Sequence, residues 1–255
     1  MHNSIGLDGN LTQKYLLRIG DTCLILAQRL AEWSGHGPVL EEDIALSNMA
    51  LDLVGQSRAV LSLAGKATGH DEDQLAFLRE ERNYYNLTLA ELPRGDFAFT
   101  VVRNTMVATL LHALWGELLQ SSNAELAAIA AQAVKEARYH QQHAADWVVR
   151  LGDGTQESHR RTQQAVDTLW RYTPECFADD AVDIEAQATG LGPSWSALQH
   201  VWQEQMQAIL EAATLVIPKA SAFVSNGKQG VHSEHMGFIL AEMQHLQRAY
   251  PGGVW

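Results

Sequence analysis

The pattern of apolar and polar residues predicts helices along almost the whole chain, because apolar residues recur at helical spacing and strand-like alternation is nearly absent. Clusters of glycine, proline, serine and asparagine separate these stretches and predict where each helix ends. The expected long helices cover residues 11–34, 39–67, 96–121 and 123–151, followed by helices near 155–172, 194–214 and 232–249, with a shorter, charged helical piece at 71–92.

Several of these helices are apolar over most of their circumference, for example around residues 24–27 and 107–111. A helix that is hydrophobic all round is buried on several sides, so the pattern predicts a thick bundle. No internal repeat, low-complexity tract or long linker divides the sequence. We therefore expect an all-α fold, a four-helix bundle with additional C-terminal helices, in a single domain covering residues 1–255.

Composition narrows the class of protein. The formal net charge is −12 and the pI is near 5.3, which argues against a nucleic-acid or anionic-membrane partner, since either needs a basic face. The chain has 2 cysteines, Cys23 and Cys176, outside any paired motif, and no signal peptide, so a reducing cytoplasm is expected. No apolar run is expected to reach the roughly 20 residues that span a bilayer.

The helix expected at 123–151 carries a stripe of possible metal ligands. At about 100° per residue, Glu136, His140, His143 and Trp147 project within a sector about 40° wide. Four-helix carboxylate di-iron proteins use a Glu-x-x-His pair from each of two helices and one Glu from each of the other two. Here the residue three places after Glu136 is Tyr139, and the histidine comes one place late.

The other long helices also carry polar residues in apolar surroundings. A buried carboxylate without a partner is costly, so each must find a hydrogen bond or an opposite charge. We interpret these positions, together with the stripe, as a polar network in the core or as the remains of a di-iron site. The candidate residues are Asp21, Asp52, Gln56, Glu117, Glu136, His140 and His143.

A count of ligands argues against a metal centre. The second helix offers Asp52 and Gln56 but no histidine between His36 and His70. One true Glu-x-x-His occurs, at Glu242 and His245 in the last helical segment, without a matching pair; a solvated or capping pair is the preferred interpretation. We expect no metal and no other cofactor in this chain.

A single zinc ion on Glu136, His140 and His143 is an alternative, but the sequence offers no convincing fourth ligand. A network of hydrogen bonds at the edge of the apolar face explains the stripe without metal, and this interpretation is preferred. The apolar face of the same helix is expected to centre near Leu126, Ala133, Ala137 and Ala144.

The segment 226–237 contains Gly-Lys-x-Gly, which is similar to a phosphate-binding loop at first sight. It lacks the full spacing of that motif, and no strand precedes it. We interpret it as a loop that leads into the next helix.

Five segments together closely resemble the C subunits of bacterial ring-1,2-phenylacetyl-CoA epoxidases, which are multicomponent di-iron monooxygenases, and the resemblance extends over nearly the whole chain. The segments are 18–21, 30–38, 51–58, 135–140 and 240–248.

This resemblance implies a ferritin-like helical fold and a catalytically silent subunit. In that family the related A subunit holds the di-iron centre and inserts one oxygen atom of O2 into the ring of phenylacetyl-CoA. A small B subunit and a reductase that uses NADPH complete the complex. Aligned with the catalytic relative, the ligand pairs fall around Leu53 and Gln56 and around Glu136 and His140, and the first pair is absent.

The resemblance thus implies a non-catalytic structural subunit that supports the A subunit in aerobic phenylacetate degradation. Two alternatives stay open. One is an active di-iron or mononuclear metal oxidoreductase that uses the stripe and Glu242 with His245. The other is a ligand-binding or storage bundle that acts alone. The sequence does not indicate which helices would contact a partner.

Overall fold

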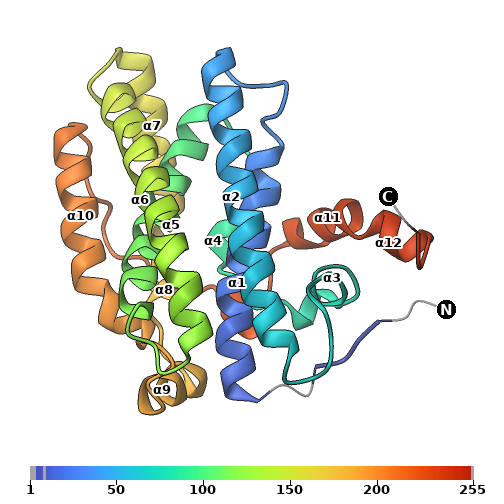
Figure 1. The fold of residues 1–255 in the computed structure, drawn as a ribbon. Coiled ribbons are helices and arrows are strands. Elements are labelled where there is room, and N and C mark those ends of the chain that lie inside the picture. Colours follow the sequence, from blue (N-terminus) through green and yellow to red (C-terminus); the bar gives the residue numbers. More distant parts are fainter. Residues whose placement is uncertain (1–3, 8–9, 254–255) are drawn as a thin grey trace. The chain divides into compact units, whose positions relative to one another are not determined.

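A computed structural model of the chain describes residues 4–7 and 10–253 (Figure 1). The chain divides into two compact units, one formed by residues up to Pro93 together with those from Ser225 onward, the other by Arg94–Val224. In the described ranges the regular elements are all helices, and β-type pairing is limited to the isolated bridges Ile5–Arg79 and Asn226–Val231. The predicted all-α fold class is confirmed, and the single domain stays a prediction.

The first unit is built on two long helices that lie side by side (Figure 1). The side chain of Asn10 caps the first of them, and the second has three acidic residues in its first turn, where the positive end of the helix dipole favours negative charge. The two helices pack closely at Gly20, where an added Cβ would lie 2.9 Å from Leu61 Cδ2. The elements of this unit are α1 (Leu11–Ala31), α2 (Leu40–Gly65), α3 (Glu72–Phe77), η1 (Glu81–Asn83), α4 (Thr88–Glu91), η3 (Gly227–Gln229), α11 (Glu234–Met243) and α12 (His245–Ala249).

The prediction of one helical element at 71–92 was wrong. This stretch forms α3, a single 3-10 turn and α4, with irregular backbone between them. After α3 the chain turns so that Arg79, Tyr84 and Asn86 are buried within the unit. On a straight helix, Tyr84 would project about 140° away from Arg79, so the two side chains could not both face the core. The last predicted helix is similarly divided, between Met243 and His245.

The second unit contains the other two predicted long helices, α5 and α6, side by side (Figure 1). Asp96 caps the first of these, and Asn123 caps the second by accepting hydrogen bonds from the backbone N–H groups of Glu125 and Leu126. Two later helices, α7 and α10, pack against both. The elements are α5 (Phe97–Leu118), α6 (Ala124–Gly152), α7 (Gln156–Trp170), α8 (Thr173–Cys176), α9 (Ala181–Ala188), η2 (Trp195–Leu198) and α10 (Gln199–Ala212). The long helices and the additional C-terminal helices match the prediction, whereas α8 and α9 were not predicted.

The composition of α5 corrects one expectation. It is 22 residues long and contains an 18-residue stretch with a mean hydropathy of 1.3, so by length and composition it could cross a membrane, contrary to the prediction that no such stretch exists. However, 78% of this stretch is buried inside the protein, as in the core helix of a globular protein.

Candidate functional site

The most buried polar groups of the first unit form a cluster around Asp21 and Arg79. Both side chains are 0% exposed. The guanidinium binds the carboxylate with two nitrogens, Nη1 to Oδ2 at 2.9 Å and Nη2 to Oδ1. The backbone N–H of Tyr85 also donates to Asp21 Oδ2, at 2.9 Å. A buried charge pair of this kind is tolerated because the hydrogen-bonding capacity on both sides is used.

Arg79 has further partners that hold it in place. Its Nη1 donates to the carbonyl oxygen of Asn83 at 2.7 Å, and its guanidinium lies 4.1 Å from the ring centroid of Tyr84. Burial lowers the pKa of Arg79, but the charge and hydrogen bonds of Asp21 outweigh this and raise the pKa above its ordinary value. The guanidinium therefore stays charged in the core.

Tyr84 connects this pair to the C-terminal helices. Its hydroxyl donates to the carbonyl oxygen of Ala76 and accepts a hydrogen bond from Gln244 Nε2 at 2.8 Å. Burial raises the pKa of Tyr84 to about 12, so the phenol is neutral and its proton is available for this bond. Gln244 Nε2 also donates to the backbone oxygen of Arg79 at 3.1 Å.

A second buried pair lies in the same unit, between Glu91 and His232. Their side chains are 0% exposed, and His232 Nδ1 lies 2.7 Å from Glu91 Oε2. The other ring nitrogen, Nε2, lies 3.0 Å from the carbonyl oxygen of Tyr84. Both ring nitrogens thus face acceptors, and only the protonated imidazolium can donate to both.

The electrostatics favour this protonated form. Burial lowers the pKa of His232, but the hydrogen bond and charge of Glu91 and the carbonyl of Tyr84 outweigh it, so the pKa is raised above its usual value. Glu91 also accepts hydrogen bonds from Asn86 Nδ2 at 2.9 Å and from the Ser233 backbone N–H at 2.6 Å. We call Asp21, Arg79, Tyr84, Glu91, His232 and Gln244 the polar cluster.

The loop 226–231 closes over the segment that carries the cluster. Arg18 donates through Nε and Nη2 to the backbone oxygen of Lys228, at 3.2 Å each. Gly230 has φ 78°, and an added Cβ there would overlap the carbonyl oxygen of Arg82. The loop then leads through Ser233, which caps α11, as predicted. The backbone oxygen of Lys228 therefore accepts hydrogen bonds from a buried arginine, and the loop is not a phosphate-binding turn.

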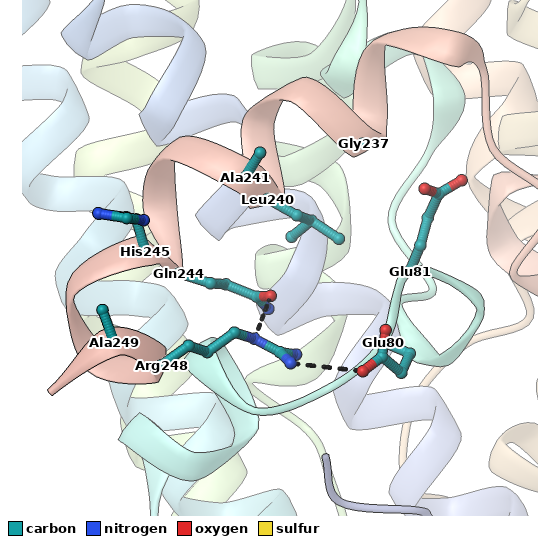
Figure 2. A pocket seen from close by; sticks show the side chains of 9 residues that line it. All are labelled: Glu80, Glu81, Gly237, Leu240, Ala241, Gln244, His245, Arg248 and Ala249. Atoms are coloured by element: carbon teal, nitrogen blue, oxygen red, sulfur yellow. Dashed lines mark hydrogen bonds and ion pairs between the residues drawn. The ribbon is translucent and has the colours of Figure 1, made fainter. Parts of the chain in front are cut away.

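A pocket of about 540 Å³ lies beside the cluster, between the C-terminal helices and the segment at Glu80 and Glu81 (Figure 2). Arg248 forms part of its wall and donates to Gln244 Oε1 at 2.9 Å, and its Nη1 pairs with Glu80 Oε1 at 3.3 Å. Figure 2 shows these two interactions side by side along one edge of the pocket. Asp21 and Arg79 are not among its lining residues.

The candidate residues of the first unit differ in how deeply they are buried. Asp21 is fully buried in the polar cluster. Gln56 is also buried, and its Oε1 accepts a hydrogen bond from Cys23 Sγ at 3.7 Å. Asp52 is half-buried, and Asn48, one turn earlier, is exposed. These three polar residues, spaced four positions apart on α2, therefore run from the surface into the core.

In the second unit, the predicted stripe lies along the edge of the buried face of α6. His140 is buried, whereas Glu136 and His143 are half-buried. Glu136 accepts a hydrogen bond from Gln132 Nε2 at 2.7 Å. The ring of Tyr139 lies near both histidines, with centroid distances of 6.2 and 6.1 Å. The predicted apolar face is confirmed, since Leu126, Ala133, Ala137 and Ala144 are all buried.

Glu117 does not occupy the buried position predicted for it, because its side chain is exposed. It lines a second pocket, of about 430 Å³, together with His112, His200 and neighbouring residues of α5, η2 and α10. Burial and the charge of Arg138 lower the pKa of His112, so this imidazole is neutral near pH 7.

The residues present do not fit a di-iron centre. On α2, Gln56 is engaged by a thiol and no histidine is available. Glu242 and His245 are both exposed, and the break between α11 and α12 separates them. Within the described parts of the chain, no group of three or more His, Cys, Asp or Glu side chains could hold a metal ion.

Sequence reasoning missed Arg79, Glu91 and His232. Arg79 is the first of several consecutive charged residues, and nothing in the sequence distinguishes it from Arg82, which is exposed. A signal did exist for Glu91, which is the only charged residue in the apolar run 87–92. His232 lies in the segment 226–237, where the resemblance to a phosphate-binding loop directed interest to the lysine instead.

Comparison with known proteins agrees with this helical architecture. Residues 8–255 match the family model described as "Phenylacetic acid catabolic protein", which is a ferritin-like helical family. The chain is 46% identical over 247 residues to the C subunit of the 1,2-phenylacetyl-CoA epoxidase of Escherichia coli (strain K12), an alignment that covers 96% of this chain and 100% of the relative. The match to the family model and the full-length similarity to this relative show that the chain belongs to the phenylacetic acid catabolic protein family.

Proposed function

We propose that this chain is the non-catalytic structural subunit of a phenylacetyl-CoA 1,2-epoxidase complex and acts in aerobic phenylacetate degradation. The observation that carries the proposal is the 46% identity over the full length of a relative named as the C subunit of that enzyme. The partners are the di-iron A subunit, a small B subunit and a reductase, in the cytoplasm.

The chemistry of the buried groups supports a structural role. The charged side chains Asp21, Arg79, Glu91 and His232 are 0% exposed, so a substrate cannot reach them. They neutralise one another in two pairs, one joining α1 to the chain after α3 and the other joining α4 to the segment before α11. Groups arranged in this way stabilise a fold rather than transfer protons to a ligand.

The subunit would act by presenting a rigid helical surface to the A subunit. A partner that binds only the folded form stabilises that form by mass action. An obligate interface of this kind buries more than roughly 2,000 Å². The contribution to epoxidation is then the stability and correct shape of the catalytic subunit, with no metal or cofactor held by this chain.

Reconstitution tests the proposal. Epoxidation of phenylacetyl-CoA is measured with the A subunit, the B subunit, the reductase, NADPH and O2, with and without this chain. We expect co-purification with the A subunit and a large loss of epoxidation when the chain is omitted. Undiminished epoxidation without the chain, or failure to co-purify, would contradict the proposal.

Metal analysis tests the alternative of an independent oxidoreductase. The chain is purified alone from cells grown with iron and zinc, and the bound metal is measured per chain. We expect amounts far below stoichiometric. Stoichiometric iron or zinc that disappears in His140→Ala or His143→Ala would instead establish a metal site on the α6 stripe.

A further inference from the structure

One face of α2 carries a row of exposed apolar side chains. Leu40, Ile44, Leu51 and Val54 are 72, 52, 68 and 39% exposed. With Ser47 between them and Arg58 after them, the intervals alternate between four and three residues. We call these six residues, Leu40, Ile44, Ser47, Leu51, Val54 and Arg58, the α2 seam.

The α2 seam lies opposite the buried face of the same helix. At about 100° per residue its six positions fall within a sector about 80° wide. Met49, Leu53 and Val60, at most 1% exposed, lie on the other side of the helix. A helix that is apolar on two opposite faces needs cover on both, and the fold of the chain supplies it on one.

The spacing indicates what kind of element fits the α2 seam. Alternation of four and three residues averages 3.5 per turn, the period at which two helices pack side by side at a crossing angle of about 20°. Strands and extended peptides do not match this period. The occupant is therefore a helix with its own apolar positions at the same spacing.

Gly55 supports a close approach at this face. It lies in the interior of α2, is exposed, and an added Cβ there would meet nothing within 4 Å. Glycine inside a helix costs about 1 kcal/mol relative to alanine, and no contact in the described part of the chain offsets this cost. A second helix packed beside the α2 seam would bring its backbone near this position.

The charges around the α2 seam favour a different protein, rather than a second copy of this chain, as the partner. Glu41 and Asp43 flank the N-terminal end of the α2 seam, and the whole chain carries a formal net charge of −12. The cation in the α2 seam, Arg58, already pairs with Glu72, with Nε 3.1 Å from Oε1. A second copy would therefore add like charge, whereas a helix with lysine or arginine at its flanks would be attracted.

We propose that the α2 seam is the docking surface for one amphipathic helix of the catalytic A subunit, with basic residues facing Glu41 and Asp43. The identity of this partner rests on the proposed function. Ile44 and Leu51 are the central apolar contacts, and Leu40 and Val54 extend them along the helix.

Binding of matched charge variants tests this assignment. Ile44→Glu and Leu51→Glu are compared with Phe238→Glu and Ile184→Glu, whose parent side chains are 70 and 62% exposed on α11 and α9. The full chain is titrated with purified A subunit. We expect each seam variant to weaken binding by about tenfold or more, and each control to bind like wild type. Thermal unfolding of each variant alone checks that all four fold.

A spin label gives a second readout that does not depend on a destabilising charge. Cys23 and Cys176 are buried, so a nitroxide on Leu51→Cys reports on the α2 seam selectively. We expect the label to become immobilised when the A subunit is added, and a label on Phe238→Cys to stay mobile.

The outcomes separate this inference from the proposed function. If wild type binds the A subunit and the seam variants bind equally well, the docking surface is wrong and the subunit role stands. If wild type does not bind the A subunit, both fail. If wild type alone forms a dimer that Leu51→Glu dissociates, a second copy is the occupant and the proposed partner is wrong.

Discussion

Asp21 and Arg79 form a fully buried ion pair that joins the middle of α1 to the chain immediately after α3, with Nη1 and Oδ2 2.9 Å apart. The two residues are 58 positions apart in sequence. Because both charges lie out of reach of water, each depends on the other for stability in the core. The fold of the first unit is therefore sensitive to the loss of either residue.

Replacement of one partner should be strongly destabilising. In Arg79→Met the carboxylate of Asp21 stays buried without its cation, and we expect the free energy of unfolding in urea to fall by about 3 to 5 kcal/mol. Arg58→Met is the matched control, because Arg58 pairs with Glu72 at the surface and such pairs contribute about 0 to 1 kcal/mol. A double variant, Asp21→Leu with Arg79→Met, should recover part of the loss. If the two arginine substitutions lowered the free energy of unfolding equally, burial would not explain the strength of the Asp21–Arg79 pair.

The Glu91 and His232 pair predicts a specific dependence of stability on pH. The pKa of His232 is raised in the folded protein above its ordinary value of 6.5, so the folded state binds this proton more tightly than the unfolded state. The stabilisation is fully present below pH 6.5 and is lost as the pH rises through the higher folded pKa. We expect the difference in unfolding free energy between wild type and His232→Asn to shrink over this range. A difference that grows as the pH rises would contradict the upward shift of the His232 pKa.

Alanine substitutions at two glycines with similar backbone angles can distinguish the cost of backbone strain from the cost of steric overlap. Gly230 has φ 78° and lies against the carbonyl oxygen of Arg82, whereas Gly69 has φ 73° and an added Cβ there would meet nothing within 4 Å. Gly69→Ala should cost about 1 kcal/mol from backbone strain alone. Gly230→Ala should cost about 2 to 4 kcal/mol, because overlap with the backbone is added. Thermal or urea unfolding measures both, and equal costs would mean that the loop moves away freely.

The long helices could be predicted closely because their signals are local. Apolar residues at helical spacing defined α1, α2, α5 and α6, and capping residues such as Asn123 defined where they begin. The same reasoning failed for the segment 71–92, whose composition is compatible with a helix. What breaks it is the inward position of Arg79, Tyr84 and Asn86, which depends on α1 and on the loop at 226–231.

For the candidate site, the sequence identified Asp21 as a polar residue in an apolar helix and therefore as a residue that needs a partner. It could not identify that partner, because Arg79 and Arg82 were equally plausible by residue type. Glu91 and His232 are 141 positions apart, a separation at which no periodicity connects two residues. The exposed apolar face of α2 could not be predicted either. When a helix is apolar on several sides, its sequence does not indicate which side the rest of the chain covers.

The sequence by itself determined that the chain is helical, where its long helices lie, that α2 lacks the histidine of a di-iron motif, and which family it resembles. These properties depend on residue type and on neighbours within a few turns, where spacing fixes the geometry. Only the tertiary structure decided that Asp21 pairs with Arg79, that His232 is held between Glu91 and the carbonyl of Tyr84, and that Leu51 stays exposed while Leu53 is buried. Partner choice and burial depend on which distant segments meet, and that is a property of the packed chain rather than of any local pattern.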